Sequence, residues 1–183
     1  TRAALAAVSA NWFGRPADAL TVIGVTGTNG KTTTTYLLKA MLEGVLGAKV
    51  GLMGTNQNMI GAEVLPAHRT TPESWEVQKL LRDMADSGCT HVVMEVSSHA
   101  LALRRVDGIR FKAGIFTNLT RDHLDFHGTM EEYRRVKGLL FRQTDTAVLN
   151  LDDEAGRYYA AAVACPAVTY SENKDEADVT ANN

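Results

Sequence analysis

The sequence has little of what marks secreted, membrane-spanning or zinc-ribbon proteins. Its two cysteines, Cys89 and Cys165, lie far apart without Cys-x-x-Cys spacing, which indicates neither a disulfide framework nor a zinc ribbon. No apolar run approaches the roughly 18 residues that a membrane-spanning helix needs. No basic segment followed by an apolar one stands at the start of the chain. We therefore expect a cytoplasmic protein with no membrane insertion.

An excess of charge of either sign is also missing. The 19 basic residues nearly balance the 21 acidic ones, and the net charge of −2 provides no broad field for nucleic acid or anionic lipid. Any phosphate group must therefore be bound by a local site. What the 183 residues do have is 45% hydrophobic and 22% charged side chains, which suits one compact domain with a sizeable core.

Short β-branched segments alternate with longer amphipathic ones. This pattern predicts an α/β fold with a P-loop-type, mostly parallel sheet and helices on both faces. We expect strands near residues 21–26, 49–54, 91–97, 113–118, 146–150 and 166–170, and helices near 31–46, 73–87, 130–142 and 153–163. Residues 55–72 lack periodicity and indicate a loop or small hairpin near the mouth of the site. Residues 177–181 look like the start of a further strand.

A glycine-rich turn joins the first predicted strand to the first predicted helix. Residues 27–33 read Gly-Thr-Asn-Gly-Lys-Thr-Thr, a short form of the phosphate-binding loop in which Val25 stands where the longer pattern has glycine. Glycines let successive N–H groups point at an anion, and the positive end of the helix adds to the attraction. Lys31 is expected to contact the β- and γ-phosphates, and Thr32 to bind Mg²⁺. This motif alone is typical of ATPases, GTPases and kinases.

Glu95 follows an apolar run, residues 91–94, and so stands at the carboxyl end of a predicted strand, where an open α/β sheet has its ligand crevice. A surface glutamate is the alternative. Ser97, Ser98 and His99 could suggest a serine hydrolase. However, adjacent residues of a strand point to opposite faces, and no Gly-x-Ser-x-Gly elbow surrounds them.

Polar residues also follow the predicted strand that ends near Thr117. They are Asp122, His123, Asp125 and His127, and by themselves they leave open a metal site of the phosphohydrolase kind. Lys137 lies in an amphipathic segment, where a single lysine is typical of a solvated surface. Neither group has an assigned role from spacing alone.

Four motifs in order resemble those of the Mur ligase family and, within it, the MurE type. They are residues 27–33, Arg-Thr-Thr-Pro-Glu at 69–73, Glu-Val-Ser-Ser-His-Ala-Leu at 95–101, and Asn-Leu-Thr-Arg-Asp-His-Leu-Asp-Phe-His-Gly at 118–128. The resemblance continues through residues 133–141 and 149–153 and covers nearly the whole chain. Four ordered motifs are much more specific than one phosphate loop.

The resemblance implies part of a three-domain enzyme, expected to be a monomer. Residues 1–20 would be a linker and the end of an N-terminal UDP-binding domain, and residues 21–183 an incomplete central ATP-binding domain. The C-terminal domain, which binds the incoming amino acid in this family, is absent from the sequence, so the chain alone is not expected to complete the reaction.

The implied reaction is the ATP-dependent addition of a third amino acid, diaminopimelate or lysine, to UDP-N-acetylmuramoyl-L-alanyl-D-glutamate. It belongs to peptidoglycan biosynthesis and passes through an acyl phosphate. The resemblance implies two Mg²⁺ ions, and a carbamate formed from CO₂ on Lys137. The implied catalytic residues are Lys31, Glu95, His123 and Lys137, and the metal ligands are Thr32, Glu95, His123 and Lys137. The nucleotide-binding residues are Gly27, Thr28, Asn29, Gly30, Lys31, Thr32, Thr33 and Asn118, and the substrate-binding residues are Thr70, Thr71, Ser97 and Arg105.

Two kinds of alternative remain open. Folylpolyglutamate synthase and cyanophycin synthetase share the phosphate loop, although the segments at 95–101 and 120–125 favour the muramoyl ligase. A non-catalytic module that only binds Mg-ATP is the alternative from another class.

Overall fold

In the computed structural model, residues 1–173 and 176–181 are described, and their strands form one nine-stranded sheet. The sheet order is β4-β3-β2-β5-β1-β6-β7-β8-β9. The strands are β1 Thr21–Thr26, β2 Val50–Met53, β3 Asn58–Ile60, β4 Glu63–Leu65, β5 His91–Glu95, β6 Phe111–Phe116, β7 Thr144–Asn150, β8 Ala167–Ser171 and β9 Val179–Thr180. Only the pairings of β3 with β2 and β4 are antiparallel. The predicted mostly parallel sheet is confirmed.

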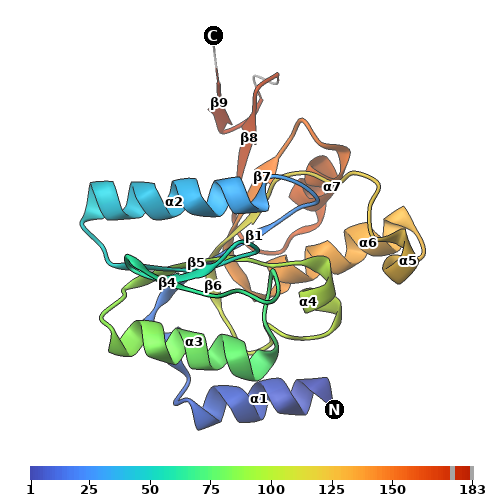
Figure 1. Cartoon of the computed structure of the whole chain (residues 1–183). Coiled ribbons are helices and arrows are strands. Elements are labelled where there is room, and N and C mark those ends of the chain that lie inside the picture. Colours follow the sequence, from blue (N-terminus) through green and yellow to red (C-terminus); the bar gives the residue numbers. More distant parts are fainter. Residues whose placement is uncertain (174–175, 182–183) are drawn as a thin grey trace.

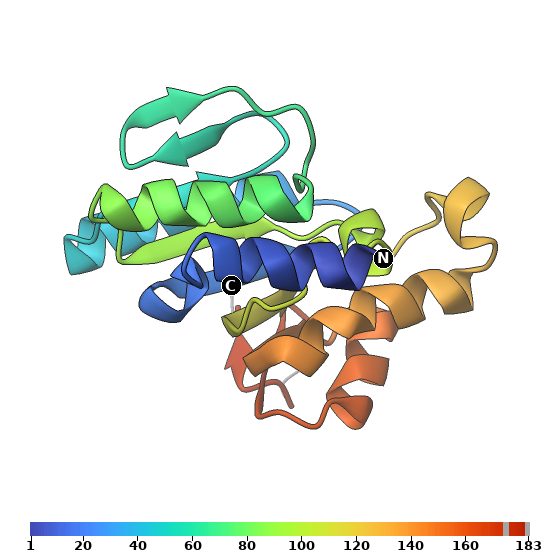
Figure 2. The same ribbon diagram turned by 90° about the horizontal axis from the view of Figure 1, so that it is seen from below.

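Helices cover both faces of this sheet, as Figures 1 and 2 show. The helices are α1 Arg2–Trp12, α2 Lys31–Leu46, α3 Ser74–Asp86, α4 Ser98–Ala102, α5 Leu124–His127, α6 Met130–Lys137 and α7 Glu154–Ala162. Two 3₁₀ segments, η1 Pro16–Ala19 and η2 Gly138–Gln143, complete the elements. α2 lies on one face, whereas α3 and α1 lie on the other (Figure 1). The predicted fold class is therefore confirmed.

The largest part of the core lies between the sheet and α3. Val77, Leu81 and Met84 recur at helical spacing on α3 and are fully buried against strand residues such as Val92 and Met94. Because helices cover both faces, the central strands are apolar throughout rather than alternating. This packing fixes the strands whose carboxyl ends carry the site.

The predicted elements agree with the structure except at a few boundaries. The segment at 55–72 contains the short hairpin β3–β4, and Val179–Thr180 does form a strand. The predicted helix at 130–142 is α-helical only to Lys137 and then becomes 3₁₀. The strand predicted at 91–97 ends at Glu95, and Ser97 is already the N-cap of α4, so Ser97, Ser98 and His99 do not alternate along a strand.

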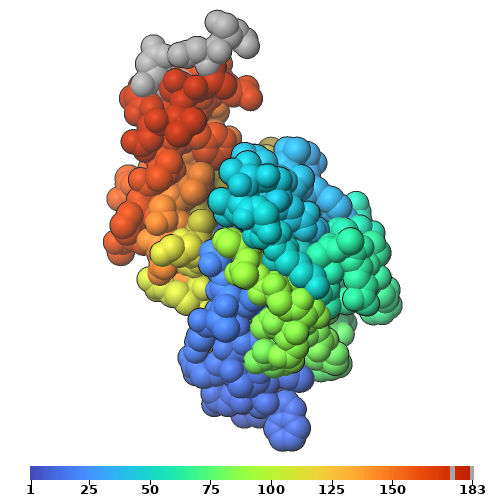
Figure 3. All heavy atoms as spheres, turned by 90° about the vertical axis from the view of Figure 1, so that its left-hand side faces the viewer, coloured from blue at the N-terminus to red at the C-terminus, as the bar shows by residue number. Residues whose placement is uncertain are grey.

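The ends of the described chain lie on opposite sides of the molecule. α1, inside the segment predicted as a linker, contacts α3. Figure 3 shows the orange and red segment that ends in β9 extending away from the blue α1. None of the helices in residues 1–173 and 176–181 combines the length and apolarity that crossing a bilayer requires.

Candidate active site

The carboxyl ends of three neighbouring parallel strands form the edge at which the predicted site residues gather. β1 lies between β5 and β6, with Val25 opposite Glu95 on one side and opposite Ile115 on the other. An open α/β sheet binds its ligands outside this edge. The segments that follow these strands contain the phosphate loop, Ser97 and Asn118, so the fold brings them together.

Two glycines shape the phosphate loop, residues 27–33. The φ angles of Gly27 and Gly30 are 151° and 83°, in the region that favours glycine. A Cβ atom on Gly27 would lie 1.9 Å from the hydroxyl oxygen of Thr117, so a side chain does not fit there. Gly30 is the N-cap of α2 and provides no capping side chain, which leaves the positive end of this helix facing the loop. The loop therefore has the geometry of an anion cradle.

Asn118, predicted to shape the nucleotide pocket, holds this loop from across the site. Its Oδ1 accepts from the N–H of Asn29 at 2.9 Å, and its Nδ2 donates to the carbonyl of Asn29 at 3.2 Å. The carbonyl of Asn118 accepts from the N–H of Thr28 at 2.8 Å. The hydroxyl of Thr117 donates to Asn29 as well, at 2.7 Å. The chain after β6 thus fixes the conformation of the phosphate loop.

Two lysines converge on one carbonyl oxygen of the loop. Lys31 Nζ donates to Gly27 at 2.9 Å and to Thr28 at 2.8 Å, and Lys137 Nζ donates to Gly27 at 2.8 Å. Burial lowers the pKa of Lys31, although nearby carboxylates oppose the shift. Burial, together with repulsion from Lys31, lowers the pKa of Lys137 to about 7 against the attraction of Asp122. Two amino groups beside one loop attract an anion such as a nucleotide phosphate.

The position of Lys137 differs from what its sequence neighbourhood alone indicates. The side chain is 1% exposed, so the interpretation as a surface lysine is wrong. α6 turns the face that carries Tyr133, Val136 and Lys137 toward the interior. The family resemblance predicts a site role for this lysine, and the structure places it beside the phosphate loop.

Glu95 lies at the centre of the site, 1% exposed at the end of β5. Its Oε1 accepts from the Thr32 hydroxyl at 2.9 Å and from the N–H of Thr55 at 2.8 Å. Its Oε2 lies 3.0 Å from the Thr55 hydroxyl. All of these partners are neutral. A buried carboxylate beside a threonine hydroxyl presents the hard oxygen atoms that Mg²⁺ prefers, so these residues fit that ion.

The predicted substrate-binding residues lie next to this carboxylate. The Thr71 hydroxyl donates to the backbone carbonyl of Glu95 at 2.8 Å and accepts from the N–H of Ser97 at 3.0 Å. Arg105 Nη1 donates to the carbonyl of Thr71 at 3.2 Å. Ser97 also caps α4, because its hydroxyl accepts from the N–H of Ala100. The fold thus joins residues from two separate motifs with Arg105, which lies outside them.

Arg105 is held by an ion pair and keeps one buried donor. Its guanidinium lies 2.7 Å from Glu73. Burial raises the pKa of Glu73, but Arg105 and Arg2 outweigh that effect and hold the pKa below its usual range. The Nε of Arg105 is buried without a hydrogen-bond partner. An anionic ligand beside this arginine would satisfy that donor.

His123 lies in a group of aromatic and imidazole rings rather than in a preformed metal cluster. It begins α5 with a φ of 51°, and its ring meets the ring of His99 edge-on at 4.9 Å. Burial, and then neighbouring cations and imidazoles, lower the pKa of His99 and His127. Within residues 1–173 and 176–181, no three His, Cys, Asp or Glu side chains gather as a metal site. The alternative phosphohydrolase-like site, from Asp122 to His127, is not formed in this part of the chain.

Sequence reasoning missed two residues that connect the site. The Thr55 hydroxyl lies 3.0 Å from both the Thr70 hydroxyl and Glu95, and so links a predicted substrate residue to the carboxylate. Thr55 stands in the segment without periodicity, where no sequence signal marks it. The Tyr133 hydroxyl lies 3.3 Å from the Thr28 hydroxyl of the phosphate loop. Tyr133 was noted only as part of the family resemblance.

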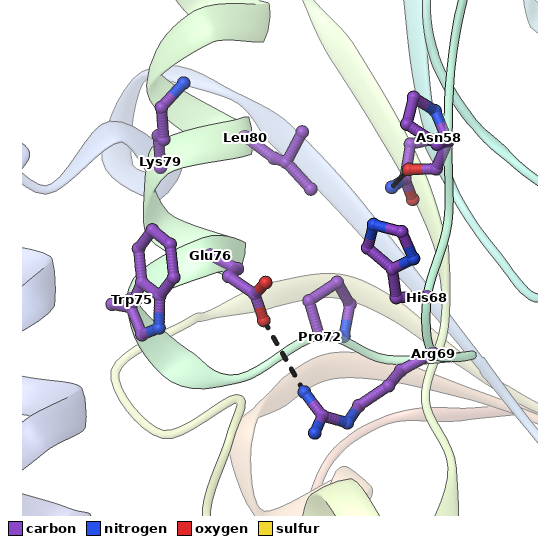
Figure 4. Close-up of a pocket in the computed structure, with 9 residues that line it drawn as sticks. Asn58, His68, Arg69, Pro72, Trp75, Glu76, Lys79 and Leu80 are labelled. Atoms are coloured by element: carbon purple, nitrogen blue, oxygen red, sulfur yellow. Dashed lines mark hydrogen bonds and ion pairs between the residues drawn. The ribbon is translucent and has the colours of Figure 1, made fainter.

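A recess of about 190 Å³ lies beside the loop that leads to Thr70 (Figure 4). Arg69 and Glu76 face each other across it at 3.9 Å. Asn58 Nδ2 donates to the carbonyl of Pro66 at 3.1 Å and so ties the hairpin to the loop. The lining contains none of the predicted site residues. The recess thus lies between the hairpin, α3 and the segment 66–72.

The comparisons with known proteins agree with this geometry. Residues 25–183 match the family model described as the Mur ligase middle domain. The chain belongs to the Mur ligase family. It is 53% identical over 174 residues to the UDP-N-acetylmuramoyl-L-alanyl-D-glutamate–2,6-diaminopimelate ligase of Clostridium tetani, covering 95% of this chain and 36% of that protein. The protein of the same name from Clostridium botulinum is 49% identical over 183 residues, covering 100% of this chain and 38% of the relative. The chain spans just over a third of the length of these relatives.

Solved structures show the same fold. A structure of a UDP-N-acetylmuramoyl-L-alanyl-D-glutamate–2,6-diaminopimelate ligase is 34% identical with a TM-score of 0.82, over 90% of this Mur ligase chain and 34% of that one. MurF from Acinetobacter baumannii shares the fold at 20% identity with a TM-score of 0.71, over 100% of this chain and 37% of its own.

Proposed function

We propose that this Mur ligase chain is the central ATP-binding part of the enzyme that adds diaminopimelate to UDP-N-acetylmuramoyl-L-alanyl-D-glutamate in peptidoglycan biosynthesis. The names of the relatives support the reaction and the amino acid. One structural observation carries the proposal: the Glu95 carboxylate accepts from Thr32 of the phosphate loop, and the Glu95 backbone carbonyl accepts from Thr71, a proposed substrate residue. A residue that contacts both would place nucleotide and acceptor side by side, which phosphoryl transfer requires.

The proposed reaction has two steps. A carboxylate oxygen of the D-glutamyl residue attacks the γ-phosphorus of ATP, ADP leaves, and an acyl phosphate forms. The amine of diaminopimelate then attacks the acyl carbon, loses a proton, and expels inorganic phosphate as the amide bond forms. The contribution of the protein is positioning and neutralisation of charge. Lys31, beside Gly27 and Thr28, supplies positive charge where the phosphates lie.

Four residues are proposed to hold two Mg²⁺ ions. Thr32 and Glu95 supply hydroxyl and carboxylate oxygens for one ion, and their oxygens already lie 2.9 Å apart. His123 and a carbamate on Lys137 would hold the other. When bound, such ions neutralise developing charge on the transferred phosphoryl group.

The substrate side is proposed to bind the muramoyl dipeptide through Thr70, Thr71, Ser97 and Arg105. The first three present hydroxyl groups beside Glu95. Arg105 supplies the free buried Nε donor for an anionic group of the substrate. An ionised acceptor of this donor would form the stronger, charge-assisted kind of hydrogen bond.

We further propose the domain organisation that the family resemblance implies. Residues 1–20 would end an N-terminal UDP-binding domain, residues 21–183 would belong to the central domain, and a C-terminal domain would bind the amino acid. The fraction of the relatives that the chain covers supports this division. The full-length enzyme is proposed to be a cytoplasmic monomer.

The experiment that tests the function measures ADP release by the full-length protein that contains this chain. Mg-ATP and the muramoyl dipeptide are supplied with diaminopimelate, lysine or glutamate in separate reactions. We expect release only when the muramoyl dipeptide and diaminopimelate are both present. Release that requires a folate and glutamate would instead identify the folylpolyglutamate alternative. ATP binding with no release under any condition would leave only the non-catalytic module.

The environment of Lys137 supports the proposed carbamate. CO₂ adds only to a neutral amine, and an unperturbed lysine with a pKa near 10.4 is neutral to only about 0.04% at pH 7. Burial and Lys31 lower the pKa of Lys137 to about 7, so that about half of the amine is neutral there. Loss of the charge also removes the repulsion from Lys31. The same burial that disfavours an ammonium group therefore prepares this lysine for modification.

A ¹³C NMR spectrum of the full-length protein in ¹³C-bicarbonate is expected to show a carbamate signal at pH 8. The signal should fall as the pH decreases through about 7, because protonation of Lys137 removes the nucleophilic amine. Lys137→Arg should lack the signal, and Lys112→Arg, at an exposed lysine, should keep it. An equally strong signal from Lys137→Arg would show that another amine carries the modification.

A further inference from the structure

Tyr133 is the side chain at which the phosphate loop, Lys137 and the histidine rings meet. It is fully buried, and its hydroxyl lies 3.3 Å from the hydroxyl oxygen of Thr28. The amino group of Lys137 lies 4.6 Å from the centre of its ring. The ring also stacks on His127, with centroids 4.8 Å apart and planes at 25°. One side chain therefore contacts the phosphate loop, Lys137 and His127.

The helix geometry explains why Tyr133 reaches Lys137. The two residues are four positions apart on α6 and so lie on the same face, one turn from each other. A residue outside this helix also holds the Tyr133 ring, because His127 stacks on it. His127 is itself fixed to α4, since its Nε2 lies 2.9 Å from the hydroxyl of Ser98. The tyrosine thus has a fixed position relative to α4 and α6.

Thr28, the phosphate-loop residue that Tyr133 contacts, is also held in place. The Thr28 hydroxyl oxygen accepts from the N–H of Thr120 at 3.0 Å, so the Tyr133 hydroxyl meets a side chain that is already fixed. Lys31 and Lys137 both contact the Gly27 carbonyl. The Tyr133 ring packs beside the Lys137 side chain and so limits where its nitrogen can lie relative to the loop.

We infer that Tyr133 is a positioning residue that fixes the phosphate loop relative to Lys137, so that the Lys137 side chain stays beside the Gly27 carbonyl. It donates no proton in the reaction and contacts the reacting atoms only through Thr28 and Lys137. The inference rests on the proposed function, because it assigns Tyr133 a role in nucleotide binding rather than in binding the muramoyl dipeptide.

Two substitutions in the full-length protein separate the hydroxyl from the ring. Tyr133→Phe keeps the ring and removes the bond to Thr28, and we expect the Kd for Mg-ATP, measured by calorimetry, to rise about fivefold. Tyr133→Leu also removes the ring that packs beside Lys137 and leaves a cavity there, so the Kd should rise by about twentyfold or more. In steady-state kinetics, the KM for ATP should rise with each variant while the KM for the muramoyl dipeptide stays within about twofold. A rise of about tenfold in the KM for the dipeptide would correspond to the loss of one charge-assisted hydrogen bond to that substrate.

Tyr158→Leu is the matched control. Tyr158 lies under the guanidinium of Arg134 at 4.1 Å, so this variant removes a similar cation–π contact from the same helix without touching the phosphate loop. Its Kd for Mg-ATP should equal that of the wild type. Unchanged ATP affinity in both Tyr133 variants would overturn the inference, as would equal losses for ATP and the muramoyl dipeptide. If Tyr133→Leu does not fold, Tyr133→Phe decides the question. Unchanged ATP binding by Lys31→Ala would overturn the proposed nucleotide site itself.

Discussion

Replacement of Lys31 by alanine is expected to lower kcat of the full-length ligase by about 10³-fold, because it removes a preorganised positive charge from the phosphoryl group being transferred. The ammonium group lies at the phosphate loop, 2.9 Å from Gly27 and 2.8 Å from Thr28. A water molecule cannot replace it, because water lacks the charge and its dipole must reorient during the reaction. The rate of ADP release at saturating substrates measures the loss.

The same substitution has a second consequence at Lys137. Lys31 helps to lower the pKa of Lys137, so its removal should raise that pKa and leave less neutral amine at pH 7. The carbamate signal of Lys31→Ala should therefore appear at higher pH than in the wild type. Lys112→Ala, at an exposed lysine paired with Asp145, is the control and should keep both activity and signal. Turnover of Lys31→Ala near the wild-type rate would contradict the assignment of the loop.

The sequence predicts the parallel sheet and the nucleotide loop well, because both depend on local signals. Apolar β-branched runs mark the central strands, and the glycines at positions 27 and 30 mark backbone conformations that favour glycine. The start of α2 at Lys31 coincides with the prediction for the same reason. These features need no knowledge of what packs against them.

The rest of the site depends on contacts between segments far apart in the chain. Whether Lys137 is solvated or buried is decided by the packing of α6 on the phosphate loop, 110 residues away in sequence. Thr55 matters only because its loop places it beside Glu95, and no pattern around it records that contact. The strand predicted at 91–97 is two residues too long because the chain turns into α4, which begins after its N-cap Ser97. The motif resemblance predicts a role for Lys137, but it does not predict the burial and the neighbour Lys31 that lower its pKa.

Glu95→Gln is expected to lower kcat by about 10²- to 10³-fold at a Mg²⁺ concentration that saturates the wild type, since the charge that attracts the cation is lost while the shape is kept. Part of this loss should be recovered at higher Mg²⁺ concentrations. Burial of the side chain makes the charge more important, because little water screens it from the ion. ADP release measured across a Mg²⁺ titration gives both quantities.

Glu95→Asp separates charge from geometry. It retains the carboxylate but shortens it by one methylene, so its oxygens withdraw from Thr32 and from Thr55, and we expect a loss of about tenfold with little change in the Mg²⁺ midpoint. Glu63→Gln, at an exposed glutamate of β4, should behave like the wild type. Equal losses in the Gln and Asp variants would mean that Glu95 acts by holding Thr55 and, through it, Thr70. A larger loss of activity and a shifted Mg²⁺ midpoint in the Gln variant alone would identify Glu95 as a metal ligand. Glutamine still accepts hydrogen bonds, so only the lost negative charge could explain that result.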